Sequence, residues 1–243
     1  EVDTYYIGDD SISKENLKQY LEKSKFSVAS NGVLYRTDEV GCIPGILDLW
    51  FKKRVEYKDE MKKYGKAGNK EKYAFFHKRQ LVQKILLNSL YGVLGLPAFR
   101  FYDVDNATAV TTTGQTVIKS TADMANIKYN KELNTPDADS NIYIDTDSVF
   151  FSAVPLLDHR IPTWKDNDQD TIAGYVNEIA EEMQDYLNDF YDILSEKIFN
   201  VDKDKHRLEI KKEYVAKAGL WVAKKRYAQW IISDNGVPVD KLD

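Results

Sequence analysis

The spacing of apolar residues predicts two long helices in the first half of the chain. Helical periodicity runs over residues 46–64 and again over residues 70–94. The polar segment GKAGN at residues 65–69 separates these two stretches, and Pro44 with Gly45 precedes the first one. Because the connection is short, we expect the two helices to pack as an antiparallel hairpin.

The rest of the chain mixes helices and strands without strict alternation. Further helices are expected within residues 13–24, from about Asn106 to Leu133, and over residues 171–199. Strands are expected at residues 32–37, 98–104, 141–151, 206–215 and 219–233, with turns at Asn31–Gly32 and Asn235–Gly236. This pattern favours an α+β fold, in which a mostly antiparallel sheet packs on helices and the helical hairpin projects from it.

Two aspartates interrupt the apolar stretch NIYIDTDSVFF at residues 141–151. If Asp145 and Asp147 lay in apolar surroundings, desolvation and mutual repulsion would disfavour their charged forms. A bound cation is the simplest compensation for such a pair. On a continuous strand both side chains would lie on one face, because side chains alternate with period two.

A file of polar side chains follows one face of the second predicted helix. At about 100° per residue, Gln80, Lys84, Asn88 and Tyr91 fall within a stripe about 80° wide. The residues around this stripe are unusually apolar. Long donors in single file on such a helix suggest a wall that faces a ligand.

The first predicted helix offers a matching basic pair. Arg54 and Lys58 are four residues apart and therefore share a face. Arginine presents a planar fork to phosphate oxygens and lysine presents a point charge, so the hairpin could hold a triphosphate between its arms. The alternative is that these cations only solvate the two helices.

The net charge of −5 hides a division along the chain. Residues 50–84 hold twelve Lys or Arg against four acids, a local charge of +8. Residues 165–202 carry −9, and residues 211–227 return to +5. This layout fits a protein that meets a polyanion with selected surfaces, and solvated helix faces are the competing interpretation.

Composition narrows the compartment. No stretch approaches the roughly 18 apolar residues that span a membrane, and the first residues lack a signal-peptide pattern. We therefore expect a cytoplasmic protein with no membrane partner. The single cysteine, Cys42, excludes an internal disulfide and is expected to be a small core residue. His77, His159 and His206 show no ligand spacing.

Three short motifs point to a family. KILLNSLYG lies at residues 84–92, YIDTDS at residues 143–148 and KKRYA at residues 224–228. In sequence and in order they resemble the signature motifs of family B, or alpha-like, replicative DNA polymerases. The segment at residues 99–115 also resembles the phage-type branch of that family. The resemblance runs from about Ser27 to Asp243 and implies template-directed DNA synthesis from dNTPs on a primer–template.

The resemblance implies a metal site at the aspartate pair. Asp145 and Asp147 match the family's metal-binding aspartates, which hold two Mg²⁺ ions, with Mn²⁺ as a substitute, and Asp147 is the stricter ligand. The same comparison implies that the stretch is a hairpin with the Asp-Thr-Asp turn at its tip. Carboxylate oxygens suit Mg²⁺, and two ions would activate the primer 3′-hydroxyl and neutralise the leaving pyrophosphate. Glu213 is the candidate for an auxiliary carboxylate, with Glu209 as second choice.

The resemblance also assigns nucleotide-binding roles to the helical hairpin. The matching residues are Arg54, Lys58, Lys84, Asn88 and Tyr91. Lys84 is the candidate catalytic cation on the incoming phosphates, and Arg54 with Lys58 would bind the γ-phosphate. Tyr91 would lie beneath the nascent base pair.

Contacts to DNA are implied at two places. Gly92 would leave room for close approach, and Lys225, Arg226 and Tyr227 match residues that follow the primer strand and its minor groove. In that groove the acceptor pattern reports base-pair geometry rather than sequence.

By the same comparison, residues 1–44 are an N-terminal palm segment, residues 45–95 are the fingers hairpin and residues 96–243 are the rest of the palm.

The chain departs from the family pattern in one important respect. The family uses a third aspartate, in a motif written approximately Asp-x-x-Ser-Leu-Tyr-Pro-Ser, to bridge both metals. Asp3, Asp9 and Asp10 lack that continuation. The exonuclease and thumb regions are not recognisable either. We therefore expect a palm and fingers fragment that is inactive alone and needs an upstream polymerase segment carrying the missing aspartate.

Two other interpretations stay open. A non-catalytic nucleic-acid-binding or assembly subunit of a split polymerase would explain the missing aspartate. A Mn²⁺-dependent glycosyltransferase would explain an Asp-x-Asp strand, but it leaves the Lys84 stripe and KKRYA without a role.

Overall fold

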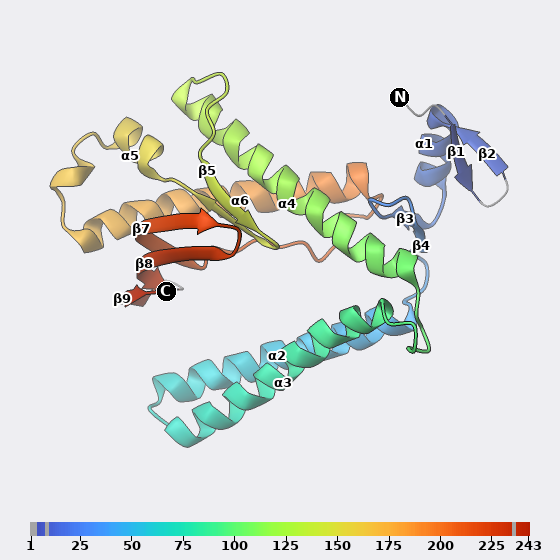
Figure 1. Ribbon diagram of the computed structural model, residues 1–243, viewed down its shortest axis with the longest axis horizontal. Helices are drawn as coiled ribbons and strands as arrows, with labels where there is room; N and C mark the ends of the chain where they lie inside the picture. Colours follow the sequence, from blue (N-terminus) through green and yellow to red (C-terminus); the bar gives the residue numbers. More distant parts are fainter. Residues whose placement is uncertain (1–3, 8–9, 235–236) are drawn as a thin grey trace. The chain divides into compact units, whose positions relative to one another are not determined.

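A computed structural model describes residues 4–7, 10–234 and 237–243 of the chain (Figure 1). Its helices are α1 (Lys14–Lys23), α2 (Cys42–Lys66), α3 (Lys70–Leu94), α4 (Val104–Leu133), α5 (Val154–Arg160) and α6 (Gln169–Ile198), with a 3-10 turn η1 (Trp164–Asp166). Its strands are β1 (Thr4–Ile7), β2 (Asp10–Ser13), β3 (Phe26–Val28), β4 (Leu34–Arg36), β5 (Asn141–Asp145), β6 (Ser148–Phe151), β7 (Tyr214–Ala223), β8 (Arg226–Asp234) and β9 (Val237–Leu242). The mixture of helices and antiparallel strands confirms the predicted α+β class.

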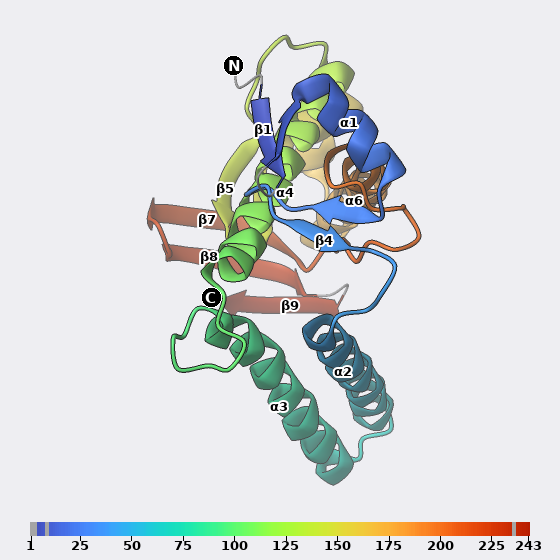
Figure 2. The ribbon, with the colours of Figure 1, turned by 90° about the vertical axis from the view of Figure 1, so that its right-hand side faces the viewer.

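The strands form several small antiparallel sheets within the described ranges. β1 pairs with β2, β3 with β4 and β5 with β6, while β7, β8 and β9 form a three-stranded sheet (Figure 2). The antiparallel pairing of the strands agrees with the prediction. The prediction was of one sheet, however, and the hydrogen bonds divide the strands among separate sheets. The predicted turn at Asn235–Gly236 lies outside the described residues.

Contacts along the chain divide it into two compact units, Glu1–Thr112 and Thr113–Asp243. In the first unit, the β3–β4 hairpin is attached to the start of α4. The Tyr35 hydroxyl donates a hydrogen bond to Asn106 Oδ1 at 2.6 Å. This contact holds a local hairpin against a residue 71 positions further along the chain.

Helices α2 and α3 form the predicted antiparallel hairpin (Figure 2). Asn69 caps α3, because its Oδ1 accepts a hydrogen bond from the Lys72 N–H at 3.0 Å. The stacked rings of Tyr64 and Phe76, 5.6 Å apart, join the two helices near the tip. No residue of α2 is buried, and in α3 only Leu94 is buried. The contact between the two helices therefore leaves every side chain except Leu94 at least partly exposed.

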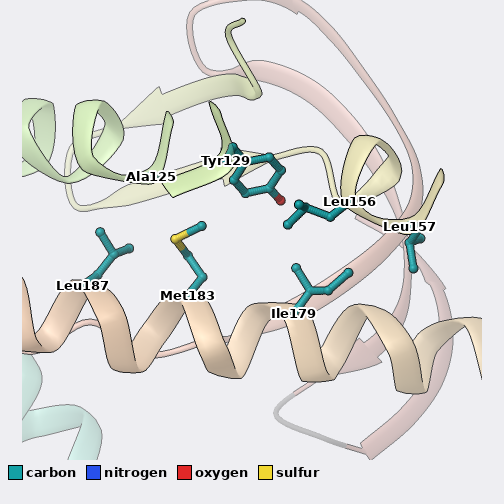
Figure 3. Packing of buried hydrophobic residues seen from close by; sticks show 7 residues of the cluster. All are labelled: Ala125, Tyr129, Leu156, Leu157, Ile179, Met183 and Leu187. Atoms are coloured by element: carbon teal, nitrogen blue, oxygen red, sulfur yellow. The ribbon is translucent and has the colours of Figure 1, made fainter. Parts of the chain in front are cut away.

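The main core of the second unit lies between α6 and the C-terminal part of α4. In Figure 3, Ile179, Met183 and Leu187 point from α6 toward Ala125 and Tyr129 of α4. Leu156 and Leu157 of α5 belong to the same buried cluster. The spacing of four residues along α6 places its core residues on one stripe, as the amphipathic pattern predicts.

The predicted strand at residues 98–104 is wrong, because the segment forms consecutive turns. The Phe99 N–H donates to the Leu96 carbonyl at 2.9 Å, and the Tyr102 N–H donates to the Phe99 carbonyl at 3.0 Å. Asp103 then caps α4 by accepting from the Asn106 N–H at 3.0 Å. Local hydrogen bonds thus satisfy the backbone without a partner strand.

The predicted strand at residues 206–215 is wrong before Tyr214, where β7 begins. The preceding backbone is bound by side chains of α6 instead of by a strand. The Ile210 N–H donates to Asn188 Oδ1 at 2.9 Å, and Asn188 Nδ2 donates to the Ile210 carbonyl at 3.1 Å. The alternating apolar residues pack on a helix, which the sequence pattern could not distinguish from pairing in a sheet.

One expectation from composition, that Cys42 is a core residue, is wrong. Cys42, expected in the core, is exposed at the start of α2. The helix begins there because Pro44 occupies an early helical position, and α2 buries none of its residues. No helix of the described residues is long and apolar enough to cross a membrane.

Candidate active site

The aspartate pair lies on the tight turn between β5 and β6. Asp145 pairs with Ser148 across the hairpin, so Thr146 and Asp147 form a two-residue loop. Thr146 has a positive φ of 54°, and the Asp147 N–H donates to the Asp145 carbonyl at 2.6 Å. The hairpin geometry with the Asp-Thr-Asp turn at its tip agrees with the expectation from the motif.

The side chains on this turn are accessible. Asp145 is half-buried and Asp147 is exposed. The expectation that both carboxylates lie in apolar surroundings is therefore wrong, because the turn places them at the end of the hairpin rather than within its arms. The Thr146 hydroxyl donates to Asp145 Oδ1 at 3.0 Å, which orients that carboxylate. Asp147 is thus open to a ligand from solvent.

The KKRYA motif forms a second tight turn, between β7 and β8. Ala223 pairs with Arg226, so Lys224 and Lys225 make the two-residue loop. Lys225 has a φ of 60°, in the left-handed region. Arg226 and Tyr227 begin β8 and are exposed. The structure therefore presents this basic motif at the end of a hairpin, as it does the aspartates.

Tyr143 joins the two motif hairpins within the second unit. Its hydroxyl accepts a hydrogen bond from the Lys225 N–H at 2.8 Å, across 82 residues of sequence. Its ring lies 5.5 Å from the ring of Tyr227. The motifs alone assigned no role to Tyr143, although its place within YIDTDS was a signal that could have indicated one.

Further rings extend this contact. Phe150 of β6 lies 6.1 Å from Trp221, 5.9 Å from Tyr227 and 6.0 Å from Tyr214. Burial in this cluster raises the pKa of Tyr214 to about 12. The aromatic cluster of Tyr143, Phe150, Tyr214, Trp221 and Tyr227 fixes the aspartate hairpin against the β7–β8 hairpin.

The proposed third carboxylate is not supported by a ligand cluster. Glu213 is exposed just before β7, and Glu209 pairs with Lys211 at 2.9 Å. Among the residues that the structure describes, no group of three or more His, Cys, Asp or Glu is arranged to hold a metal ion. Asp3 and Asp9 lie outside the described residues. Asp145 and Asp147 are therefore the two carboxylates that the hairpin itself brings together.

The nucleotide-binding candidates lie in the first unit, on one flank of the α2–α3 hairpin. Tyr73 of α3 contacts Gly65 of α2 so closely that a Cβ on Gly65 would lie 3.2 Å from the Tyr73 ring. Lys84 is about 20° from Tyr73 around α3, and Arg54 and Lys58 are each about 20° from Gly65 around α2. These three cations therefore share one flank, which we call the Lys84 flank.

Side chains on the Lys84 flank are open toward the base of the hairpin. Lys84, Asn88 and Tyr91 are exposed, and Gln80 is half-buried. A Cβ placed on Gly92 would meet no atom within 4 Å. Three of the four predicted donors are therefore accessible to solvent, as contact with a ligand would require.

Arg54 carries an unsatisfied donor. Its Nε atom is buried and has no hydrogen-bond partner among the described residues. Leaving a buried donor unpaired costs about 1–3 kcal/mol, and more for a charged group.

Comparison with known proteins identifies the family. The family model described as DNA polymerase family B matches residues 7–240. The chain belongs to DNA polymerase family B. This confirms the family inferred from the three motifs. The match covers the aspartate hairpin, the KKRYA hairpin and the α2–α3 hairpin.

Several curated relatives are DNA polymerases. The DNA-directed DNA polymerase of Enterobacteria phage T4 is 33% identical over 158 residues, which cover 61% of this chain and 17% of the relative. That of Escherichia phage RB69 is 32% identical over 158 residues, covering 61% of this chain and 17% of the relative. A DNA polymerase of Thermococcus gorgonarius is 27% identical over 226 residues, covering 93% of this chain and 23% of the relative. The chain thus spans less than a quarter of each of these family B relatives.

Proposed function

We propose that this chain contributes to template-directed DNA synthesis by transferring a nucleotide from a dNTP to a primer 3′-hydroxyl. The observation that carries the proposal is the hydrogen bond of 2.8 Å from the Lys225 N–H to the Tyr143 hydroxyl. It joins a turn with two carboxylates to a basic turn suited to a DNA backbone. Metal and primer contacts would therefore lie on neighbouring turns of one unit.

The carboxylates of Asp145 and Asp147 suit Mg²⁺ by their chemistry and by their exposure. Carboxylate oxygens are hard ligands, and Mg²⁺ commonly binds through one or two protein carboxylates together with substrate phosphates and water. The exposed turn leaves Asp147 free for substrate-side coordination, while Thr146 orients Asp145. Two bound Mg²⁺ ions, or Mn²⁺, would supply charge stabilisation at the primer oxygen and the leaving pyrophosphate.

The Lys84 flank would bind the incoming nucleotide. Arg54, Lys58 and Lys84 bring three positive charges to this flank. Lys84 would stabilise the charge that develops on the phosphates or donate a proton to the leaving group. Asn88 would contact phosphate, and Tyr91 would support the nascent base pair.

The β7–β8 turn would hold the primer–template. Lys225 and Arg226 offer cations to phosphates, and Tyr227 offers an exposed ring edge near the minor groove. Gly92, with open space at its Cα, would allow DNA to approach α3. These contacts position the duplex without reading its sequence.

The described residues suggest an incomplete catalytic centre. The family resemblance implies three carboxylates, and the β5–β6 turn carries two, Asp145 and Asp147. We therefore expect the 243-residue chain to bind metal, nucleotide and DNA but not to extend a primer by itself. This same observation favours the second candidate function, a nucleic-acid-binding subunit without turnover.

Nucleotide binding tests the assignment of the Lys84 flank. Fluorescent dNTP binding to the purified chain should weaken about tenfold in Lys84→Ala, as expected for one lost phosphate contact. Lys131→Ala, which removes an exposed lysine from α4, is the matched control and should bind as the wild type does. Equal binding by Lys84→Ala, or a preference for sugar nucleotides, would reject the polymerase assignment.

Primer extension tests the incomplete centre. The chain should extend a primer only when a polypeptide carrying an Asp-x-x-Ser-Leu-Tyr-Pro-Ser motif is added. Extension that also disappears in Asp147→Asn would assign catalysis to this chain together with its partner. Robust extension by the chain alone would contradict the incomplete centre, and no extension with any partner would favour the non-catalytic subunit.

A further inference from the structure

The side of the α2–α3 hairpin that faces away from the Lys84 flank carries its own set of rings and cations. Around α3, Arg79 lies about 140° from Lys84 and Lys72 about 120° from it. Arg79 donates a hydrogen bond to the Tyr57 hydroxyl of α2, and Lys72 donates one to the Tyr64 hydroxyl. We call this side the Arg79 flank. It is made of Tyr57, Tyr64, Lys72, Phe75, Lys78, Arg79, Val82 and Gln83. None of these residues has a part in the proposed function.

Cations on the Arg79 flank lie over aromatic rings. The Arg79 guanidinium is 4.6 Å from the ring centre of Phe75 and 5.8 Å from that of Tyr57. Lys72 Nζ lies 4.7 Å from the ring centre of Tyr64. Arg79 donates one hydrogen bond, to the Tyr57 hydroxyl at 3.4 Å. Four of its five donors are therefore available to a ligand, within the part of the chain that the structure describes.

A shallow groove runs along this flank. Tyr57, Lys78, Arg79, Val82 and Gln83 line it. Lys78 and Arg79 bring positive charge to the groove, and Tyr57 brings an aromatic ring. The groove thus combines cations with ring surface.

Apolar surface beside the groove is exposed to solvent. Phe75 is 50% exposed and Val82 is 52% exposed. These side chains offer apolar area that a bound base could cover.

This combination matches single-stranded nucleic acid better than other polyanions. Unpaired bases offer flat faces that stack on aromatic rings and on arginine, while their phosphates need cations nearby. In a duplex the base faces are already stacked, and an acidic peptide would leave the rings uncovered.

We propose that the Arg79 flank binds a segment of single-stranded nucleic acid, as a site distinct from the Lys84 flank. A base would stack on Phe75 beside Arg79, and the adjoining phosphates would contact Lys78, Arg79 and Lys72. This site requires neither the metal carboxylates nor a dNTP, so it stands or fails separately from the proposed function.

Fluorescence anisotropy with a labelled 20-nucleotide oligothymidylate, in EDTA and without dNTP, tests the site on the whole chain. Phe75→Leu keeps apolar volume but removes the ring, and it should weaken binding about tenfold, as expected for one lost stacking contact. Phe75→Tyr should retain wild-type affinity. Arg79→Gln should weaken binding and lower the slope of log affinity against log salt by about 0.7.

Phe101→Leu provides the matched control. Phe101 is another exposed phenylalanine of the first unit, 52% exposed and with Arg100 over its ring at 6.0 Å. The Phe101→Leu variant should bind the oligonucleotide as the wild type does. Circular dichroism should show that every variant is folded. Equal loss in Phe101→Leu and Phe75→Leu would overturn the proposal. So would wild-type affinity in Phe75→Leu, equal affinity for a blunt duplex of the same length, or Phe75-dependent binding of polyglutamate in place of the oligonucleotide.

Discussion

Helices α3 and α6 are both long and rich in apolar residues, yet they use them differently. Seven residues of α6 are buried, including Met183 and Leu187, whereas Leu94 is the one buried residue of α3. On α3, Val82 and Ile85 remain 52% and 55% exposed. The comparison teaches that apolar content in α6 builds a core, while in α3 much of it remains accessible to solvent.

Polar groups do not follow the same division. In the second unit Thr121 and Arg160 are satisfied by protein partners. Buried polar atoms without partners among the described residues nevertheless occur in both units: Arg54 Nε and Gln83 Oε1 in the first, and Asn141 Oδ1, Ser195 Oγ, Trp221 Nε1 and Gln229 Nε2 in the second. The regions therefore differ in apolar packing, and the following substitutions test that packing and the internal pairs of the second unit, in order of expected effect.

The largest effect is expected from Met183→Ala in the core. Met183 is 1% exposed between α4 and α6, so its truncation should lower the free energy of unfolding by about 2–5 kcal/mol. The comparison variant is Val82→Ala on α3, which should change the free energy of unfolding by less than about 0.5 kcal/mol. Urea denaturation followed by circular dichroism measures both. Similar losses of unfolding free energy in the two variants would contradict the difference in packing between α6 and α3.

A smaller effect is expected from Arg160→Ala. Arg160 donates to Glu132 at 2.5 Å and to Glu182 at 2.8 Å, which joins α4, α5 and α6. Hydrogen bonds from Arg160 hold the pKa of both carboxyls below the usual glutamate range. Because the network is partly exposed, its loss should cost about 1–2 kcal/mol at pH 7.

The pH dependence of this network has a definite sign. A carboxyl whose pKa is lower in the folded than in the unfolded state stabilises the fold above its unfolded pKa. That contribution disappears as the pH falls through the folded pKa. Urea titrations should therefore show the wild type and Arg160→Ala differing most near pH 7 and converging below about pH 4. A difference that is constant from pH 7 to pH 3 would contradict the ion-pair origin.

The smallest effect is expected from Tyr191→Phe. The Thr121 hydroxyl donates to the Val117 carbonyl at 2.8 Å, so the Tyr191 hydroxyl is the donor in its 2.8 Å contact with Thr121. Removing that donor should cost about 0.5–1.5 kcal/mol, measured by thermal or urea unfolding. A stability equal to that of the wild type would show that the core does not depend on internal polar pairing.

Much of the fold could be predicted because local signals agree with the tertiary structure. The breaks around residues 65–69 and the helical periodicity gave α3 and α6 nearly to their ends. Helix α2 begins at Cys42, four residues before the predicted start, because its first turn includes Pro44. The strand predicted at residues 98–104 failed because side-chain alternation does not reveal whether a partner strand exists. The segment before Tyr214 failed for the related reason that Asn188 of α6 supplies its hydrogen bonds.

The candidate site could be predicted only in its parts. The motif resemblance pointed to Asp145, Asp147 and KKRYA, although KKRYA was expected in a strand and forms a turn. Helical periodicity gave the Lys84 stripe and the Arg54–Lys58 pair, whose nucleotide-binding roles stay predictions. The Tyr143 contact with Lys225 could not be predicted, because it joins residues 82 positions apart through packing of aromatic rings. The exposure of Asp147 was likewise missed, since a turn and a buried strand share the same apolar flanks.

The central claim is that the aspartate turn and the KKRYA turn act as one site for metal and DNA. Primer–template affinity of the whole chain, measured by anisotropy with and without Mn²⁺, tests it most directly. Mn²⁺ should tighten duplex binding by the wild type, Asp147→Asn should abolish that enhancement, and Tyr143→Phe should reduce it in a chain that remains folded. An enhancement by Mn²⁺ that is unchanged in Asp147→Asn would contradict the claim.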